Sequence, residues 1–349
     1  MKSRNTRLLK AAFLEPVDRT PVWFMRQIGR YQREYREYRA KYKLLDIFNN
    51  AELAAELTLL PFKQTDFDGA VIFADILPPL ISMGLDLQFT VGSGPYIDNP
   101  ITCPADVDRL AAPPAEESMP STLRAVEIAS AELAGRGIPV IGFCGAPFTL
   151  ASYALEGGGS RNYERVKSFM YSQPAAWQRL MNKLVTVLAD FAVKQTQAGA
   201  AIVQIFDSWV GLATGEEDYL RFIQPHNKAL FDLLQKNSIP SIHFSTGTSG
   251  YLDVVAQTGG DVISVDWRVS LSKAWRQIGN GKAIQGNLDP IALMAPWREL
   301  QFHIDRVLDS VRGRTGHIFN LGHGILPNTP VDHVRRAVDY VHERTGAGK

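Results

Sequence analysis

The chain has 349 residues, of which 45% are hydrophobic and 21% charged, and its formal net charge is +1. This composition is ordinary for a globular protein, and the near-zero charge argues against general binding to nucleic acid or another polyanion. The two cysteines, Cys103 and Cys144, are too few for a disulfide scaffold and lack the spacing of a metal site. We therefore expect a reducing, cytoplasmic setting.

The amino-terminal segment Met1–Pro16 is basic, and its apolar stretch, Leu8–Leu14, is interrupted by Lys10. Such a stretch is too short and too charged for a secretory signal. No window approaches the roughly 18 apolar residues of a membrane-spanning helix. We therefore expect a soluble protein with no membrane partner.

The first part of the chain predicts two buried strands. Val22–Met25 and Ala70–Ala74 are apolar throughout rather than alternating, which is typical of strands buried on both faces. A helix is predicted between them at Glu52–Leu60. The following stretch, roughly Gly92–Pro120, is rich in Pro, Gly and Asp. We interpret it as an irregular insertion within one domain.

After the insertion, strand-like runs alternate with helices. Helices are predicted at Ser121–Ala134, Pro174–Ala198 and Tyr219–Asn237, and the long second one has apolar residues spaced by three and four. The remaining strand runs are Val140–Phe143, Ile202–Phe206, Ser241–Phe244, Val262–Val265, Lys282–Ile284 and His317–Leu321.

Eight strand–helix units predict an α/β fold, a single (β/α)8 TIM-type barrel domain over residues 1–349 with the insertion after the second strand. An open doubly wound sheet is the alternative. It would normally show a Gly-rich turn after the first strand, where this chain has Arg26-Gln27-Ile28-Gly29-Arg30. In such barrels the reactive residues collect at the carboxyl ends of the strands, so the residue that follows each run is a candidate.

Three carboxylates follow predicted strands. Asp75 comes directly after Ala70–Ala74 with no turn between them. A carboxylate at the end of an apolar strand is poorly solvated, and it needs donors, a cation or a function. Asp207 and Asp266 hold similar positions on later strands, and for them a structural role and a functional one are equally open.

Arginines are concentrated after the first predicted strand. Arg26 and Arg30 follow that strand at the mouth of the barrel, where guanidinium groups offer planar forks for carboxylate or phosphate. Arg33 and Arg36 have glutamates beside them, so we expect a solvated helix face there.

Two further side chains are candidates at the same end. Tyr153 is placed so that its phenol can point back to the mouth, although a core tyrosine fits the spacing equally well. His323 has glycines on both sides, which lets the backbone approach a ligand and exposes the imidazole. The strand ends offer only His243 and His323 as imidazole ligands, with no cysteine in a ligand pattern, so we predict no metal site.

These residues carry a resemblance to the uroporphyrinogen decarboxylase family that covers almost the whole chain in order. Pro21–Tyr31 closely resembles the amino-terminal signature of that family, and Ile72–Leu77 resembles its second signature. Further blocks are similar at Gly142–Leu150, Glu156–Gly158, Val265–Trp267, Gln285–Pro290 and Asn320–Gly324.

The resemblance implies a single (β/α)8 barrel, a homodimer and no cofactor. It implies conversion of uroporphyrinogen III to coproporphyrinogen III in haem and other tetrapyrrole synthesis, with loss of carbon dioxide from four acetate side chains. It further implies catalytic roles for four of the site residues, Asp75, Arg26, Tyr153 and His323. The substrate-binding residues carried over by motif are Arg26, Gln27, Arg30, Arg39, Asp75, Tyr153, Phe206, Ser208 and His323.

The chain departs from the family pattern in one segment. The family commonly has Ala-Gly-Arg-Tyr-Leu-Pro-Glu-Tyr-Arg where this chain has Ile28–Arg36. We expect the bulky Ile28 to narrow the substrate pocket. We also expect the loss of the Leu-Pro pair, replaced by Gln32 and Arg33, to change the path of the segment.

Two other functions are weighed against this one. A zinc-dependent, corrinoid-linked methyltransferase on the same barrel would show His-x-Cys at the fifth strand, where this chain has His243-Phe244-Ser245. A non-catalytic tetrapyrrole-binding protein would keep the arginines without needing Asp75, Tyr153 and His323 together.

Overall fold

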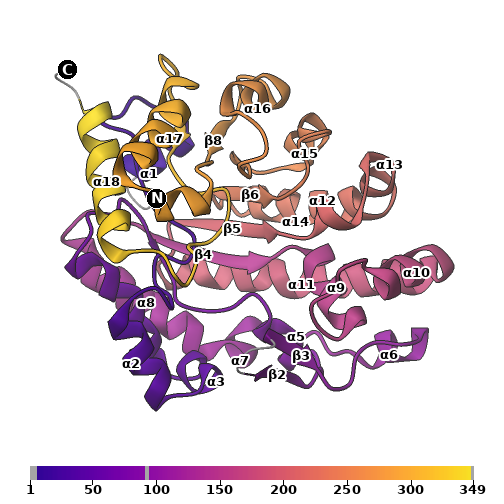
Figure 1. Ribbon diagram of the computed structural model, residues 1–349. Helices are drawn as coiled ribbons and strands as arrows, with labels where there is room; N and C mark the ends of the chain where they lie inside the picture. The colour runs from indigo at the N-terminus through magenta and orange to yellow at the C-terminus, as the bar shows by residue number, and fades with distance from the viewer. Residues whose placement is uncertain (1–5, 91–93, 347–349) are drawn as a thin grey trace.

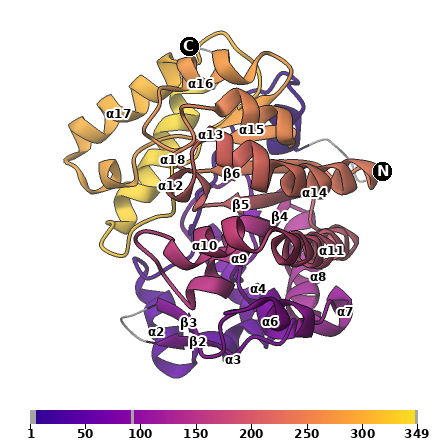
Figure 2. The same ribbon diagram turned by 90° about the vertical axis from the view of Figure 1, so that its right-hand side faces the viewer.

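The computed structural model describes residues 6–90 and 94–346, and its centre is a curled parallel sheet (Figures 1 and 2). Neighbouring strands of this sheet follow one another along the chain, and their residues are buried. Burial on both faces is the reason why the strands are rich in apolar residues, although some also carry buried polar side chains such as Gln204, His243 and Gln285. The strands are, in sheet order, β1 (Ala70–Val71), β4 (Val140–Gly145), β5 (Ile202–Asp207), β6 (Ser241–Ser245), β7 (Val262–Ser264), β8 (Ala283–Gln285) and β9 (His317–Ile318).

Helices lie outside this sheet (Figure 2). The sequence-predicted helices correspond to α4 (Ala51–Leu59), α8 (Pro120–Ala134), α11 (Pro174–Ala198) and α14 (Gln224–Lys236), the last preceded by the π-helical turn η2 (Tyr219–Ile223). The apolar residues of α11 are buried, and the helix ends at Gly199, whose φ of 133° favours glycine. The other helices are α1 (Arg7–Ala12), α2 (Arg33–Lys41), α3 (Leu44–Phe48), η1 (Leu60–Lys63), α5 (Pro78–Ser82), α9 (Pro147–Glu156), α10 (Glu164–Ser172), α12 (Val210–Ala213), α13 (Glu216–Asp218), α15 (Leu252–Thr258), α16 (Leu271–Ile278), η3 (Pro290–Met294), α17 (Trp297–Asp309) and α18 (Val331–Thr345).

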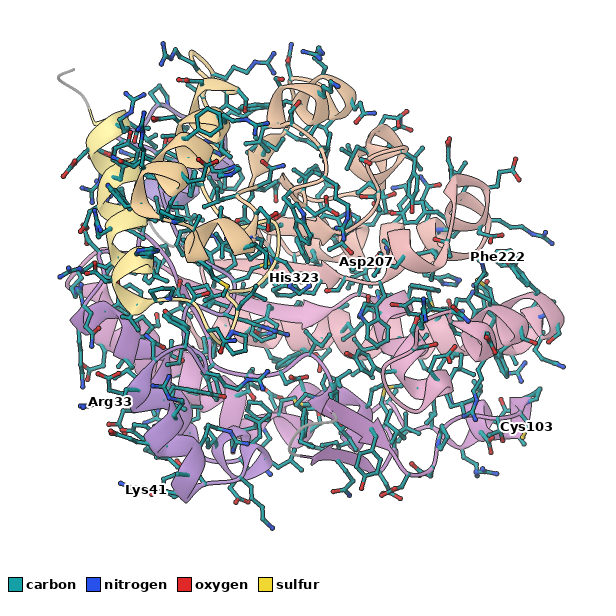
Figure 3. All side chains as sticks on the ribbon, in the orientation of Figure 1. Arg33, Lys41, Cys103, Asp207, Phe222 and His323 are labelled. Atoms are coloured by element: carbon teal, nitrogen blue, oxygen red, sulfur yellow. The ribbon has the colours of Figure 1, made fainter. Side chains whose placement is uncertain are left out.

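The stretch expected to be irregular contains regular structure. Strands β2 (Leu87–Thr90) and β3 (Gly94–Ile97) form an antiparallel pair, and α6 (Pro104–Arg109) and α7 (Ala115–Ser118) follow; residues 91–93 lie outside the described residues. Cys103, which precedes α6, is exposed at the edge of the molecule (Figure 3). The Ile97 N–H donates to the Gly157 carbonyl over 2.8 Å, so the pair is held against the end of α9.

The first predicted strand, Val22–Met25, is not a strand in the structure. Val22 forms a single parallel bridge with Phe319. The Phe319 N–H donates to the Pro21 carbonyl over 2.9 Å, and on the other side the Asp68 N–H donates to the Val22 carbonyl over 2.8 Å. The segment is therefore buried and bonded on both sides, next to β9 and next to β1. It makes too few hydrogen bonds with its neighbours to be a strand. An apolar sequence pattern does not indicate how many such bonds will form.

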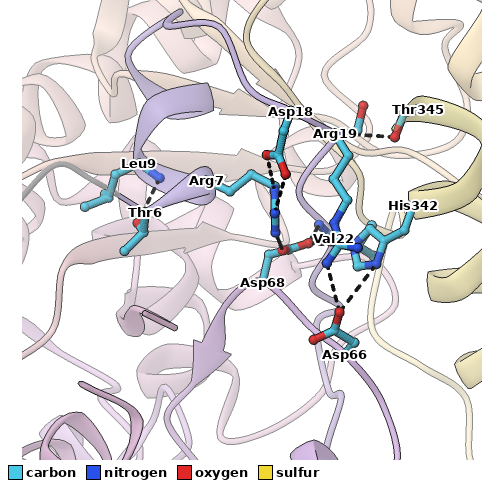
Figure 4. Close-up of polar contacts among 11 residues, drawn as sticks. Thr6, Arg7, Leu9, Asp18, Arg19, Val22, Asp66, Asp68, His342 and Thr345 are labelled. Carbon is cyan, nitrogen blue, oxygen red and sulfur yellow. Dashed lines mark hydrogen bonds and ion pairs between the residues drawn. The ribbon is translucent and has the colours of Figure 1, made fainter. Parts of the chain in front are cut away.

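Asp68 connects this segment to both ends of the chain (Figure 4). Its carboxylate accepts hydrogen bonds from the Val22 N–H and from His342 of α18, both over 2.7 Å, and it pairs with Arg7 of α1. Burial would raise the pKa of Asp68, but the bonds from His342 and Val22 and the charge of Arg7 together hold it below its ordinary value. Asp68 therefore stabilises the placement of the segment that leads into Arg26.

We expect Asp68→Asn to lower the free energy of unfolding by about 1–3 kcal/mol at neutral pH. The loss of a fully buried ion pair costs about 3–5 kcal/mol, and Arg7 here is partly exposed and keeps Asp18 as a partner. A carboxyl group with a lowered pKa contributes stability above its unfolded pKa of about 4 and loses it as the pH falls. The difference between wild type and variant in urea unfolding should therefore shrink towards acid pH. Asp66→Asn, which changes an exposed neighbour, is the control, and an equal loss in both variants would contradict the assignment.

Within residues 6–90 and 94–346, none of the helices combines the length and the apolar character that crossing a membrane requires.

Candidate active site

The candidate residues follow consecutive strands of one parallel sheet, so most of them lie at its carboxyl end. Asp75 follows β1, Tyr153 lies on α9 after β4, and His323 follows β9. The Arg26 charge acts on the pKa of all three of these side chains, in each case behind the larger effect of burial. The structure therefore brings together the four residues to which the sequence assigns catalysis.

Arg26 has an unusual backbone conformation. Its φ of 60° lies in the left-handed region, which costs a residue other than glycine about 1–2 kcal/mol. The loop after β9 holds it there, because the Met25 N–H donates to Asn320 over 3.2 Å and the Ile325 N–H donates to the Met25 carbonyl over 2.9 Å. This strained turn directs Arg26 against Gly324.

The two glycines beside His323 leave room for neighbouring protein groups. A Cβ atom on Gly324 would lie 2.5 Å from Cδ of Arg26, and one on Gly322 would lie 2.4 Å from the backbone nitrogen of Trp267. A side chain at either position would therefore clash with these neighbouring protein groups. Close approach of a ligand to the same backbone stays a prediction. The sequence indicates a close approach, but it does not say which group approaches.

Asp75 lies in an environment that disfavours its charge. Its Oδ1 accepts a hydrogen bond from the Leu77 N–H over 3.0 Å. Burial raises the pKa of Asp75, against the opposing effects of the Leu77 N–H and the Arg26 charge. No Lys, Arg or His of the described residues lies within 4.0 Å of this carboxylate. Asp75 is thus a carboxylate with backbone support and no ion-pair partner.

The Tyr153 ring is partly exposed and packs on one side against Trp209. The ring packs against Trp209 at a centroid distance of 3.9 Å and an interplanar angle of 33°. Burial, followed by the charge of Asp75, raises the pKa of Tyr153 well above its ordinary value. Its hydroxyl therefore stays protonated and can donate a hydrogen bond. Sequence reasoning missed Trp209, although it directly follows the candidate Ser208.

His323 is neutral at physiological pH. Its Nδ1 accepts a hydrogen bond from the Gly324 N–H over 2.8 Å, which places the ring proton on Nε2. Burial lowers the pKa of His323 to about 4, and the charges of Arg26 and Arg268 act in the same direction, against Asp266. Nε2 is therefore a neutral donor. Arg268, which contributes to this state, was not among the sequence candidates.

Phe206 and Ser208 flank the end of β5. The Phe206 ring is partly exposed and meets Phe143 and Phe244 edge to face, each at 5.5 Å. The Ser208 carbonyl accepts a hydrogen bond from the Thr246 hydroxyl over 2.5 Å, which ties the loops after β5 and β6 together.

The arginines divide into two groups. Arg26, Arg30 and Arg39 all act on the pKa of Tyr35, which burial raises and their charges partly lower, so each of the three lies near Tyr35. In the part of the chain that the structure describes, no carboxylate lies within 4.0 Å of any of them. They form a group of cationic side chains without an ion-pair partner, as an anionic ligand would require.

Arg33 and Arg36 behave differently from that group. Arg33 forms an exposed ion pair with Glu37 over 3.4 Å and lies at the edge of the molecule (Figure 3). Arg36 was expected to be solvated, but it donates to the carbonyl groups of Arg30 and Tyr31 over 2.8 and 3.0 Å. Its guanidinium group is exposed and yet supports the backbone of Arg30.

The Gln27 side chain supports the turn that carries Arg26. It has no exposed surface, and its amide accepts from the Phe24 N–H over 3.3 Å and donates to the Gly69 carbonyl over 3.1 Å. These two bonds position the turn. A contact between Gln27 and substrate stays a prediction.

The two departures from the family pattern, at Ile28 and at Gln32-Arg33, are accommodated by contacts within the same segment and its neighbours. Ile28 is buried in a cluster with Tyr35, Ile47, Leu57 and Leu60, and an effect of its size on the substrate pocket stays a prediction. Its size is accommodated because the side chain turns into this satellite core. Gln32 accepts a hydrogen bond from the Gly29 N–H over 3.2 Å, so its amide closes the turn that precedes α2.

Asp266 is a structural carboxylate. It accepts hydrogen bonds from the backbone N–H groups of Gly247 and Arg268 over 2.7 and 2.8 Å, and it pairs with the Arg268 guanidinium over 2.8 Å. It thereby joins the loops after β6 and β7. Asp207, which directly precedes Ser208, is buried, and no such cation lies within 4.0 Å of it among the described residues.

A cavity of about 500 Å³ lies at the amino end of the sheet, away from these residues. Its lining includes Arg7, Asp18, Arg19 and Asp66, whose charges pair with one another. The chemistry at the carboxyl end is the stronger indication of a functional site. Among the residues that the structure places, no group of three or more His, Cys, Asp and Glu side chains is arranged to hold a metal ion.

Known proteins match nearly the whole length of this chain. The family model for uroporphyrinogen decarboxylase (URO-D) matches residues 3–344. A uroporphyrinogen decarboxylase from Solibacter usitatus is 48% identical over 339 residues, which cover 97% of each chain. Another from Chloroflexus aurantiacus is 49% identical over 339 residues, covering 96% of this chain and 95% of the relative.

Solved structures share the fold at low identity. A methyltransferase from Methanosarcina mazei has a TM-score of 0.79 and 21% identity, covering 97% of this chain and 98% of its own. A putative vitamin-B12-independent methionine synthase from Listeria monocytogenes has a TM-score of 0.53 and 12% identity. Identities this low bear on the fold alone, whereas the full-length match to the family model and the relatives near 48% identity place this chain in the uroporphyrinogen decarboxylase family.

Proposed function

We propose that this protein decarboxylates the four acetate side chains of uroporphyrinogen III to give coproporphyrinogen III in haem and tetrapyrrole biosynthesis, without a cofactor. Membership of the family supports the reaction. The observation that carries the site assignment is that Arg26, Arg30 and Arg39 lie near Tyr35 without carboxylate partners, and that the Arg26 charge also acts on Asp75. The substrate has eight carboxylates and four convergent pyrrole N–H groups, so it requires both cations and a central acceptor.

The chemistry needs no external electron sink. Protonation of a pyrrole carbon makes a cationic ring, and the bond between the acetate methylene and its carboxylate then breaks. The electron pair of that bond neutralises the ring, carbon dioxide leaves, and protonation of the methylene carbon with loss of the ring proton completes the methyl group. We assign to Asp75 the stabilisation of the cationic ring, because a fixed carboxylate in a poorly solvated site is effective where positive charge develops.

The other side chains have complementary roles in this proposal. Arg26 holds the carboxylate of the reacting acetate, with Arg30 and Arg39 on other carboxylates. The protonated Tyr153 hydroxyl and the neutral Nε2–H of His323 donate hydrogen bonds to the substrate. Phe206 and Ser208 contact it from the end of β5.

Release of carbon dioxide from uroporphyrinogen III by the purified protein tests the function. We expect coproporphyrinogen III to accumulate with four carbon dioxide molecules released per substrate. Tight binding of the tetrapyrrole without any release would favour the non-catalytic alternative and reject the proposal.

We expect turnover to survive exhaustive chelation. A zinc-dependent methyltransferase-like site would need His243 as a ligand, but this imidazole is fully buried against Phe231 at a ring distance of 4.7 Å. Metal analysis of the purified protein should accompany the assay. Stoichiometric zinc whose removal abolishes activity would contradict the prediction.

We further propose that Val22–Met25 takes the place of an eighth strand and closes the sheet into a (β/α)8 barrel that forms one domain over residues 1–349. The bonds of this segment to Phe319 and to Asp68 support closure.

For the assembly, we propose a cytoplasmic homodimer. Two free cysteines fit a reducing compartment, and the exposed Leu212 and Leu220 on α12 and η2 offer apolar surface for a second copy. Sedimentation equilibrium would report a monomer if the dimer is wrong.

A further inference from the structure

Asp207, the last residue of β5, joins three elements behind the candidate site. Its Oδ1 accepts a hydrogen bond from the Thr149 hydroxyl of α9 over 3.1 Å, and its Oδ2 accepts one from the Asn227 amide of α14 over 2.8 Å. The side chain has no exposed surface and lies in the interior of the molecule (Figure 3).

The residues that Asp207 reaches are close in sequence to the site. Thr149 precedes Tyr153 by one helical turn on α9, so a bond from Thr149 to β5 limits the rotation and translation of that helix. Ser208 is the next residue after Asp207. Tyr153 in turn packs on Trp209, two residues after Asp207, so α9 contacts the end of β5 at a second point.

The surroundings of Asp207 contain no compensating cation. The groups that face it are Thr149 of α9, Asn227 of α14, Tyr219 of η2 and Tyr251, and within the described ranges no Lys, Arg or His lies within 4.0 Å of its carboxylate. Burial raises the pKa of Asp207 to about 7, against the two hydrogen bonds. The Asn227 Oδ1 atom has no partner, so rotation of this amide would offer an acceptor to a protonated carboxyl group.

We propose that Asp207 is a buried clamp that holds α9 against β5 through its hydrogen bonds and thereby positions Tyr153 and Ser208. It is a positioning residue, since it touches neither substrate nor reacting atoms. The proposal rests on the decarboxylase activity proposed above, but the state of α9 can be measured without that activity.

Four variants distinguish the loss of the hydrogen bond between Asp207 and Thr149 from a general loss of stability. Asp207→Ala and Thr149→Val remove the bond, and we expect kcat/KM to fall by about tenfold or more, because small misplacements of site groups are costly. Thr149→Ser keeps the hydroxyl. Asp207→Asn keeps an uncharged group that can bond to Thr149 and to a rotated Asn227 amide. These two conservative variants should stay within about threefold of wild type, since the bonds are retained.

Ser152→Ala is the matched control on the same helix. Its hydroxyl is buried and bonds only within α9, to the Phe148 carbonyl over 2.8 Å. Removing it leaves the contact with β5 intact. Hydrogen exchange of the α9 amides should therefore accelerate in Asp207→Ala and Thr149→Val but not in Ser152→Ala.

A double-mutant cycle shows whether Asp207 acts through Tyr153. In a Tyr153→Phe background, the additional loss caused by Asp207→Ala should shrink to about twofold, because coupled residues are not additive. Full additivity would overturn the positioning role, even if both single variants are impaired.

The raised pKa of Asp207 predicts a pH-dependent difference in stability between wild type and Asp207→Asn. A carboxyl group whose folded pKa lies above its unfolded pKa of about 4 destabilises the fold progressively as the pH rises towards about 7. The melting temperature of Asp207→Asn relative to wild type should therefore increase between about pH 5 and pH 8. If Asp207→Asn is as inactive as Asp207→Ala, or if α9 exchange is unchanged in the clamp variants, the proposal is wrong. An inactive wild type would reject the decarboxylase function alone, because hydrogen exchange still tests the clamp.

Discussion

Asp75→Asn should lower kcat by a factor on the order of 10²–10³ while the protein stays folded. The carboxylate lies in the loop after β1, four residues beyond the strand, without an ion-pair partner and near Arg26 and Tyr153, where the pyrrole N–H groups of the substrate would meet it. An amide keeps the shape and one acceptor oxygen but loses the charge that stabilises the cationic ring. Steady-state kinetics with uroporphyrinogen III measure the effect.

The stability of this variant serves as its control. Because burial raises the pKa of Asp75, the charged form is the one that the fold disfavours. Replacing it by a neutral amide should leave the free energy of unfolding at neutral pH unchanged or raised. Functional residues often lower the stability of the folded state in this way.

The pH dependence provides a second check on Asp75. If the ionised form is required, kcat/KM of the wild type should fall as the pH drops through the raised pKa of this group. The acid limb should therefore lie above the ordinary range of an aspartate, and it should vanish in the residual activity of Asp75→Asn. Near-normal turnover in the folded variant would reject the central role of Asp75.

Arg26→Ala and Arg30→Ala should each reduce turnover of uroporphyrinogen by orders of magnitude, whereas Arg33→Ala should change it only slightly. The first two guanidinium groups have no carboxylate partner within 4.0 Å among the described residues, so their charge is free for the substrate. Arg33 already has Glu37, in an exposed pair worth about 0–1 kcal/mol. Steady-state kinetics on the folded variants decide between the two groups.

Arg36→Ala should reduce turnover less than Arg26→Ala and more than Arg33→Ala. Its guanidinium group supports the carbonyl of Arg30 rather than a ligand, so the variant should show a modest effect that follows from a displaced Arg30. Arg26→Lys adds a test of geometry, because an ammonium group keeps the charge but loses the planar fork. If Arg33→Ala proves as damaging as Arg26→Ala, the whole segment contacts substrate and our division is wrong.

Local patterns in the sequence determined much of the fold. The largely apolar runs at β4 and β5 identify strands, because burial on both faces removes the alternation of a half-exposed strand. The three-and-four spacing in α11 identifies a helix whose bounds the structure reproduces at Pro174 and Ala198. Asp75 and His323 were accessible to the same reasoning, because the position after a buried strand is itself a local property.

Other features depended on contacts between distant parts of the chain. Val22–Met25 has the composition of a strand, yet its state is decided by Phe319 and Asp68, and Asp68 is in turn held by His342. Ile28 and Gln27 follow the same strand-like run as Arg26, but one turns into a satellite core and the other bonds to Gly69. Periodicity and spacing describe neighbours along the chain, whereas side-chain direction and hydrogen-bond partners arise only when the sheet curls. The sequence by itself therefore determined the strands, the helices and the residue types at their ends, and the tertiary structure decided which of those residues are free to meet a ligand.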